Sequence, residues 1–199
     1  MTGSNGLAGA LKTVASGGTL EREHVQGLFE GVLDGADDPV LLGGFLAALA
    51  QRGETADEVA GVAAALRARM TPFEHDADDA IDTCGTGGDG LGTFNLSTAA
   101  AFVAAAAGAK GVKHGNRSVS SRAGSADVLE ARGGAIDVDD DVARAALERT
   151  GFTFLFAPRF HPAMRHAGPV RKALGIRTVF NLVGPLANPG RVRRQVVGV

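Results

Sequence analysis

The sequence predicts an α/β protein that consists of a small N-terminal helical subdomain, residues 1–70, and a larger α/β domain, residues 71–199. Before residue 70 the apolar residues recur every three or four positions, which is the period of an amphipathic helix. After residue 79 short apolar runs alternate with helical patterns and glycine-rich turns, which is typical of strands and helices in an α/β sheet. The stretch 70–79, rich in acidic residues, separates the two patterns.

In the helical subdomain we expect helices at residues 7–15, 21–33, 39–52 and 55–69. Thr19, Asp38 and Thr55 are expected to cap the last three, because a short polar side chain can accept a hydrogen bond from a free N–H in the first turn. The pair Asp57 and Glu58 is interpreted as part of a surface turn. The apolar faces of these helices fit either a dimer interface or a cover over the second domain.

In the second domain we expect strands at residues 80–84, 111–113, 135–136, 152–157 and 194–199, and helices at 99–107, 126–132 and 140–149. Ser125 and Asp139 are placed as helix starts, and Gly108 and Gly151 as helix ends. Residues 158–175 are expected to form a connection, and 181–190 a loop rich in glycine and proline.

A strand that runs directly into glycines lies at residues 80–89. Glycines such as Gly85 and Gly88 let the backbone approach a ligand closely. Ser97 and Thr98 follow at the start of an alanine-rich helix, where free N–H groups and the helix dipole favour an anion. By itself this pattern also fits an ordinary strand-to-helix turn. It matches neither a Walker A loop nor the dinucleotide fingerprint, so nucleoside triphosphates and NAD are disfavoured as ligands.

A second cluster of polar residues follows the next short strand, in the sequence KHGNRSVSS at 113–121. Lysine and arginine neutralise phosphate charge, while hydroxyl and backbone N–H groups define its geometry. A solvated basic turn would explain the charges but not the serines and glycines among them. The second cluster therefore favours a phosphate site, built from Lys113, His114, Asn116, Arg117, Ser118, Ser120, Ser121 and Ser125.

Six motifs together resemble the anthranilate phosphoribosyltransferases: DTCGTGGD at 82–89, NLST at 95–98, KHGNRSVSS at 113–121, GSADVLE at 124–130, HPAMR at 161–165 and NLVGPL at 181–186. The resemblance covers the whole chain. It implies the class II-type fold shared by nucleoside phosphorylases and phosphoribosyltransferases. It also implies a magnesium-dependent transfer of phosphoribose from phosphoribosyl pyrophosphate to anthranilate, in tryptophan biosynthesis, by a homodimer that associates through the helical subdomain.

The resemblance assigns roles to individual residues. Ser97 would ligate Mg²⁺, and anthranilate would contact Gly85, His114, Asn116 and Arg171. No residue is assigned as a catalytic acid or base, since transfer through an oxocarbenium-like state depends on stabilising the leaving group. The residues implied for phosphoribosyl pyrophosphate are Gly85, Gly88, Asp89, Thr93, Asn95, Leu96, Ser97, Thr98, Lys113, His114, Gly115, Asn116, Arg117, Ser118, Val119, Ser120, Ser121 and Ser125.

Two further residues have structural and functional interpretations. His161, which precedes a proline, either shapes its loop or caps the next helix. Arg171 is interpreted as an anthranilate ligand, because an arginine fork suits a planar carboxylate. The alternative is that Arg171 belongs to a solvated helix face together with Arg165 and Lys172.

Members of that family continue well beyond 199 residues, and an Asp-Glu pair in the later part ligates magnesium. We therefore expect a C-terminally incomplete sheet with an uncovered edge strand. The chain is then either a transferase, active alone or completed by a separate C-terminal chain, or an inactive remnant that only binds phosphoribosyl pyrophosphate. A relative of the pyrimidine nucleoside phosphorylases is a third reading, against which the KHGN and HPAMR motifs argue.

Composition excludes several classes of protein. Lys and Arg total 20 against 22 acidic residues, and Trp and Tyr are absent, so nucleic acid is not expected as a partner. There is no apolar tract of membrane-spanning length and no basic-then-apolar leader, so we expect a cytoplasmic protein without a membrane partner. Cys84 is the sole cysteine, which rules out an internal disulfide, and it is expected to be a small buried residue rather than a nucleophile.

Overall fold

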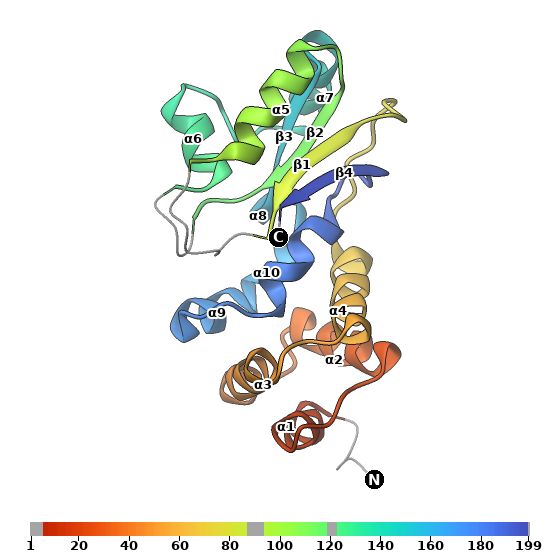
Figure 1. The fold of residues 1–199 in the computed structure, drawn as a ribbon, viewed down its shortest axis with the longest axis vertical. Helices are drawn as coiled ribbons and strands as arrows, with labels where there is room; N and C mark the ends of the chain where they lie inside the picture. Colours follow the sequence, from red (N-terminus) through yellow and green to blue (C-terminus); the bar gives the residue numbers. More distant parts are fainter. Residues whose placement is uncertain (1–5, 87–93, 119–122, 199) are drawn as a thin grey trace. The chain divides into compact units, whose positions relative to one another are not determined.

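The computed structural model describes residues 6–86, 94–118 and 123–198. The chain forms two compact units (Figure 1). The helical unit comprises Met1–Met70 together with His161–Ala187, and the sheet unit comprises Thr71–Phe160 together with Asn188–Val199. The sequence places residues 161–187 in the second domain, whereas in the structure they pack with the helices of the first unit.

The four expected N-terminal helices are confirmed as α1 (Leu7–Ala15), α2 (Arg22–Asp34), α3 (Pro39–Arg52) and α4 (Ala56–Arg69). Within this unit α1 packs against α3, and α2 against α4. Phe29 lies at the centre of the core, with ring centroids 6.1 Å from Phe45 and 5.5 Å from Phe180. The second segment of the unit adds η1 (Pro162–Arg165), α9 (Gly168–Leu174), α10 (Val179–Val183) and η2 (Gly184–Ala187).

Two of the three expected helix caps are confirmed. Asp38 Oδ1 accepts from the N–H groups of Val40 at 2.7 Å and Leu41 at 3.2 Å. Thr55 forms a reciprocal capping box with Glu58: its hydroxyl accepts from the Glu58 N–H at 3.3 Å, and its own N–H donates to the Glu58 carboxylate at 2.8 Å. These bonds satisfy backbone donors that the first helical turn leaves free.

The structure contradicts the surface position expected for Glu58 and the capping role expected for Thr19. Glu58 is fully buried, because its carboxylate forms an ion pair with Arg52 and accepts the Leu20 N–H at 3.0 Å. Since Leu20 is held by this bond, α2 begins only at Arg22. Its N-cap is Glu21, which makes no side-chain capping bond. The sequence shows the charges but not the partners that the fold brings to them.

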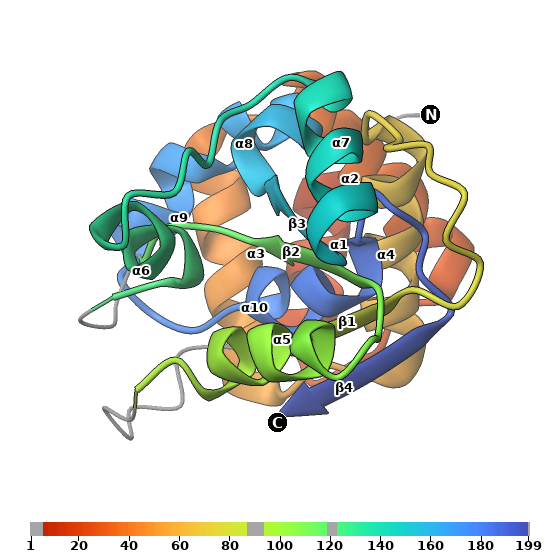
Figure 2. The ribbon, with the colours of Figure 1, turned by 90° about the horizontal axis from the view of Figure 1, so that it is seen from above.

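Among its described residues, the sheet unit contains four parallel strands in the order β3-β2-β1-β4. Ile81 pairs with Gly111 and with Arg194, and Gly111 pairs with Phe152, so the strands begin at one level. Figure 2 shows the sheet from above. Its strands are β1 (Ile81–Gly85), β2 (Gly111–Gly115), β3 (Phe152–Phe156) and β4 (Arg194–Gly198), and its helices are α5 (Leu96–Ala106), α6 (Ser125–Ala131), α7 (Asp140–Thr150) and α8 (Ala157–Phe160).

Two small cores support the sheet. Val112 and Leu155 are fully buried in one of them, and Phe154 packs with Ala126 and Ile136 in the other. The expected strand at residues 135–136 is wrong, because Ile136 contributes its side chain to the core that α6 and β3 form, without joining the backbone ladder. β4 is the edge strand beside β1, as expected.

Three other expectations need correction. Residues 181–190 are not a plain loop: the N–H of Thr178 bonds to Asn181 Oδ1 at 3.1 Å, and this bond starts α10. The alanine-rich helix α5 begins at Leu96 rather than at residue 99, so Ser97 and Thr98 lie in its first turn. Asp139 precedes α7 but makes no capping bond, because its side chain pairs with Arg159 at 2.9 Å.

None of the described helices combines the length and hydropathy of a membrane-spanning segment.

Candidate functional site

The two polar motifs meet at one edge of the sheet. β1 ends at Gly85 and its parallel neighbour β2 ends at Gly115, so the backbone leaves both strands on the same side of the sheet unit (Figures 1 and 2). α5 follows the first of these strands and α6 follows the second. In open parallel sheets ligands bind outside the carboxyl ends of the strands, which makes this edge the candidate site.

Hydrogen bonds join the start of α5 to β1, to Lys113 of the second motif and to Ala123, which follows that motif. Asn95 Nδ2, at the start of α5, donates to the carbonyl of Ala123 at 3.1 Å. The Thr83 hydroxyl, on β1, donates to the carbonyl of Ser97 at 2.6 Å. Lys113, on β2, approaches the Ser97 hydroxyl with its Nζ at 3.5 Å. The first turn of α5 is therefore anchored to both strands and to the second motif.

The sequence suggests that Lys113 is a phosphate ligand, but in the structure its side chain is buried. It is 2% exposed, and its ammonium group donates to the carbonyl of Thr83. Burial lowers the pKa of Lys113, and the nearby Asp82 carboxylate only partly opposes this shift. The positive charge thus lies between the backbone of β1 and the Ser97 hydroxyl.

Asp82 and Asn188 form a buried polar network; Asp82 opens the DTCGTGGD motif, but neither residue was assigned a role from the sequence. Asp82 Oδ2 accepts from Asn188 Nδ2 at 2.9 Å, and burial raises the pKa of Asp82 despite this bond and the nearby Lys113. Asn188 also donates to the carbonyl of Val112 at 3.0 Å and accepts from the N–H of Gly190 at 2.8 Å. The sequence gives one indication for Asp82, which is a charged residue inside an apolar strand. No sequence pattern indicates the role of Asn188.

Cys84 is buried, as expected. Burial and the neighbouring Asp82 raise the pKa of the Cys84 thiol to about 12. Because the thiolate is the nucleophilic form, this environment does not support covalent catalysis by Cys84 at neutral pH.

The start of α5 has the features of an anion site. Thr98 Oγ1 is buried and forms no hydrogen bond among the described residues. Buried polar atoms are normally hydrogen-bonded, so an unpaired hydroxyl in the first turn of an eleven-residue helix calls for a polar partner. The helix dipole favours an anionic one.

In the second motif Arg117 pairs with acidic residues of α6. Its guanidinium bonds to both carboxylate oxygens of Glu130, one of them at 2.7 Å, and lies 3.6 Å from Asp127. The same group stands 5.8 Å from the ring centre of Phe156. Bonding to Glu130 raises the pKa of Arg117. Arg117 therefore links the end of β2 to α6; both acidic partners lie in the GSADVLE motif, but they were assigned no role from the sequence.

The structure brings many of the sequence-predicted residues together in the sheet unit. Arg171 belongs to the helical unit, on α9. Other candidates lie outside the described residues: Gly88, Asp89, Thr93, Val119, Ser120 and Ser121. Those described in the sheet unit are Gly85, Asn95, Leu96, Ser97, Thr98, Lys113, His114, Gly115, Asn116, Arg117, Ser118 and Ser125.

His161 and Arg171 are both held inside the helical unit. His161 Nε2 lies 2.9 Å from the carbonyl of Ala187, and burial lowers the pKa of the imidazole. His161 makes no side-chain capping bond to η1, so the structure does not support its interpretation as a helix cap. The guanidinium of Arg171 lies 5.1 Å from the ring centre of Phe180, and burial lowers its pKa. An arginine packed on an aromatic ring is not part of a solvated face.

A protein-only metal centre is not found in the part of the chain that the structure describes. No group of three or more His, Cys, Asp or Glu side chains is arranged to hold an ion there. Ser97 offers a hydroxyl, but the ammonium of Lys113 lies 3.5 Å from it. Since Ser97 supplies one hydroxyl only, a magnesium ion beside it would need most of its oxygen ligands from a bound ligand and from water.

Two family models match this chain. Residues 8–70 match the helical bundle domain of a glycosyl transferase family, and residues 77–199 match the a/b domain of the same family. A protein of Anaeromyxobacter sp. (strain Fw109-5) named anthranilate phosphoribosyltransferase is 53% identical over 180 residues, which are 90% of this chain and 53% of that protein. The chain thus spans about half the length of the curated relatives it matches.

Solved structures agree with these matches. The crystal structure of anthranilate phosphoribosyltransferase from Thermus thermophilus has a TM-score of 0.86 and 48% identity, covering 96% of this chain and 58% of that one. The enzyme from Saccharomyces cerevisiae in complex with PRPP and Mg has a TM-score of 0.85 and 31% identity, covering 97% of this chain and 58% of that one. By its helical bundle and a/b domains, the chain belongs to this glycosyl transferase family and is similar to its anthranilate phosphoribosyltransferases.

Proposed function

We propose that this chain binds phosphoribosyl pyrophosphate where β1 and β2 end, and that it transfers the phosphoribosyl group to anthranilate in tryptophan biosynthesis. The observation that carries the proposal is the joining of two phosphate-type motifs at one sheet edge, through the bond from Asn95 to Ala123 and the contact between Lys113 and Ser97. A ligand with a phosphate at one end and a diphosphate at the other matches two such motifs. The solved yeast relative is named for its complex with that ligand and magnesium.

In this proposal the first motif holds the diphosphate. The free N–H groups of α5 and the hydroxyls of Ser97 and Thr98 face the anion, and the buried charge of Lys113 is oriented toward Ser97 from β2. Fixed donors of this kind stabilise the charge that develops on a leaving pyrophosphate without having to reorganise. Mg²⁺, when bound with the diphosphate through Ser97, supplies further neutralisation of that charge. The second motif, from His114 to Ser118, holds the other phosphate and the ribose.

For anthranilate we propose the contacts that the family resemblance implies, which are Gly85, His114, Asn116 and Arg171. Arg171 is suited to the anthranilate carboxylate, because it is partly desolvated and its guanidinium is packed against the ring of Phe180. A desolvated arginine binds a carboxylate more strongly than a solvated one.

Binding and turnover are tested together. We expect calorimetric titration of the 199-residue chain to show binding of phosphoribosyl pyrophosphate with Mg²⁺, weaker binding when Mg²⁺ is chelated, and weaker binding still of inorganic phosphate. Formation of phosphoribosyl anthranilate is followed in parallel by fluorescence. Binding without turnover would leave the chain a phosphoribosyl pyrophosphate-binding remnant that requires a separate C-terminal chain. Tight binding of inorganic phosphate, with none of phosphoribosyl pyrophosphate, would favour a nucleoside phosphorylase instead.

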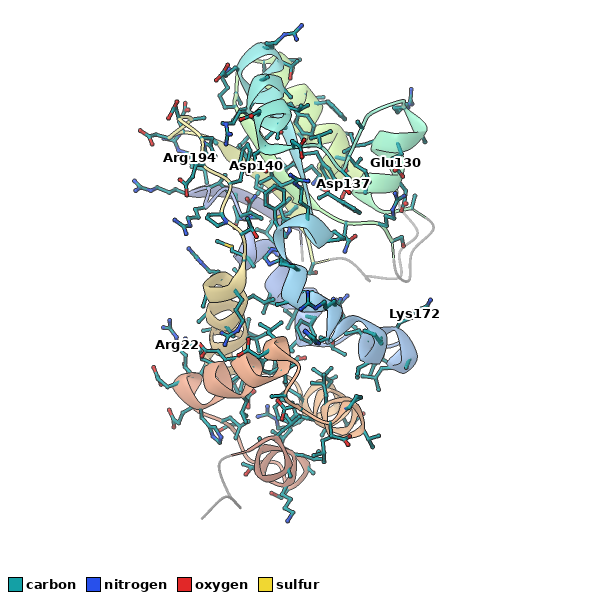
Figure 3. All side chains as sticks on the ribbon, turned by 180° about the vertical axis from the view of Figure 1, so that it is seen from behind. Arg22, Glu130, Asp137, Asp140, Lys172 and Arg194 are labelled. Carbon is teal, nitrogen blue, oxygen red and sulfur yellow. The ribbon has the colours of Figure 1, made fainter. Side chains whose placement is uncertain are left out.

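Replacing Arg171 with alanine is expected to weaken anthranilate binding by about 10- to 100-fold, the effect of losing a hydrogen bond to a charged group. The affinity for phosphoribosyl pyrophosphate should stay unchanged. Arg171→Lys should recover only part of the loss, since an ammonium lacks the planar fork. Lys172→Ala is the matched control, because Lys172 is the next residue of α9 and its side chain points away from the ribbon in Figure 3. Equal anthranilate affinity in all four proteins would remove Arg171 from the site.

The homodimer, its association through the helical unit and the cytoplasmic location remain predictions.

A further inference from the structure

Asp127, on α6, accepts two backbone hydrogen bonds, one from the second motif and one from the residue before α6. Its Oδ2 receives the N–H of Ser118 at 2.9 Å and the N–H of Gly124 at 2.7 Å. A single carboxylate oxygen therefore holds Ser118, which follows β2, beside Gly124, which precedes α6, and we call this arrangement the closure.

The two sides of this closure are in direct contact. A Cβ atom at Gly124 would lie 2.5 Å from both the carbonyl oxygen of Asn116 and the nitrogen of Ser118, so only glycine fits there. The carbonyl of Asn116 also accepts from the N–H of Ala126 at 3.2 Å. Asn116 and Ser118, both assigned above to ligands, thus receive their positions from the first turn of α6.

A carboxylate is an unexpected neighbour for phosphate-binding residues, because like charges repel. Here the charge of Asp127 is engaged by two N–H donors and by Arg117 at 3.6 Å, and these bonds lower the pKa of its carboxyl group. The two N–H donors and the guanidinium offset part of the negative charge of this carboxylate. The position of Asp127 is explained by the N–H groups of Ser118 and Gly124 that it binds, and not by contact with a ligand.

We propose that Asp127 is a positioning residue for phosphoribosyl pyrophosphate, acting by fixing Asn116 and Ser118 through the closure at Gly124. This inference rests on the proposed function for its ligand. It assigns to Asp127 a role in binding without contact to the substrate. The adjacent Glu130 holds Arg117 and takes no part in the closure.

The test compares Asp127→Asn, Asp127→Glu and a control, Asp141→Asn. An asparagine at 127 carries no charge: its amide oxygen is a weaker acceptor for the two N–H groups, and its N–H₂ group would then face the guanidinium of Arg117 instead of a carboxylate oxygen. A glutamate can still reach the N-cap N–H, as in an ordinary capping box. Asp141 stands in the first turn of α7 with its side chain 92% exposed and paired with Arg144, so Asp141→Asn makes the same chemical change away from the motif. The affinity for phosphoribosyl pyrophosphate with Mg²⁺, amide hydrogen exchange at Ser118 and Gly124, and unfolding by urea are measured for each protein.

For Asp127→Asn we expect at least about tenfold weaker binding and about tenfold faster exchange at Ser118 and Gly124, with little change in the urea midpoint. Asp127→Glu should recover part of both losses, and Asp141→Asn should behave as the wild type. Unchanged exchange at Ser118 and Gly124, or faster exchange with unchanged affinity, overturns the inference. A loss of affinity that merely parallels a lower urea midpoint overturns it as well. Absence of binding by the wild type overturns the proposed function, and exchange then reports on the closure alone.

Discussion

Replacement of Glu58 by alanine is expected to destabilise the helical unit by about 3–5 kcal/mol, the usual cost of removing one partner of a buried ion pair. The fully buried carboxylate accepts the N–H groups of Leu20 and Thr55 at 3.0 and 2.8 Å, and it is paired with Arg52. Alanine would leave two buried donors and a largely buried guanidinium without their acceptor. The free energy of unfolding is measured by urea titration followed by far-UV circular dichroism, since the chain has no Trp or Tyr.

Asp57→Ala is the matched control for Glu58, because Asp57 is exposed in the same helical turn. Its effect should stay within about 0.5 kcal/mol. Burial raises the pKa of Glu58, but the bonds from Thr55, Arg52 and Leu20 outweigh it and hold the pKa below the ordinary 4.5. The stabilisation is therefore complete above pH 4.5 and is lost as the pH falls through the lower, folded-state value. The alanine variant should lack this component of acid sensitivity, and equal stability of the two variants at neutral pH would contradict the assigned role.

Replacement of Gly61 by alanine is expected to destabilise the protein by about 1–3 kcal/mol, although alanine is the better helix former. A Cβ atom at Gly61, in α4, would lie 2.5 Å from the carbonyl oxygen of Arg22 and 2.8 Å from the Cβ of Val25, both in α2. Backbone atoms cannot rotate away, so α2 and α4 would have to separate and the packing around Phe29 would loosen.

Replacement of Gly27 by alanine, in the same pair of helices, is expected to have the opposite effect on stability. Nothing lies within 4 Å of a Cβ placed at Gly27 in α2, so alanine there should stabilise the protein by about 0.5–1 kcal/mol through helix propensity. Both variants are compared by thermal and urea unfolding. If both substitutions shifted stability in the same direction, the close approach of α2 and α4 would not be the reason for glycine at position 61.

The helices of the first unit were predictable because each carries its own signal. The apolar period of residues 7–69 and the capping positions of Asp38 and Thr55 are local patterns, and local hydrogen bonds are enough to express them. Thr19 and Glu58 show the limit of such patterns. The partners of Glu58 come from the end of α3 and the segment before α2, so neither its burial nor the start of α2 can be read from neighbouring residues.

The candidate site also has features that the sequence predicts and features that only the structure shows. Glycines after a strand and clustered Lys, Arg and Ser residues are chemical signals in the sequence itself, and they indicate phosphate without any coordinates. The sequence does not show that Lys113 points inward to Thr83, or that Asp127 closes the segment around Ser118. Which side of a strand a residue faces, and what lies opposite, depends on the packing of the whole sheet.

By itself, then, the sequence determined the fold class, the four N-terminal helices, the strands that lead into the two motifs and the chemistry of the residues that follow them. Only the tertiary structure decided that residues 161–187 pack with the helical unit and that Glu58 and Lys113 are buried. It also decided that Asn188 joins β1 to β2 and that Asp127 joins Ser118 to the start of α6. The reason is physical. Helix periods and turn chemistry act over a few residues, whereas burial and buried hydrogen bonds join residues separated by dozens of positions, and their partners are chosen by the folded chain.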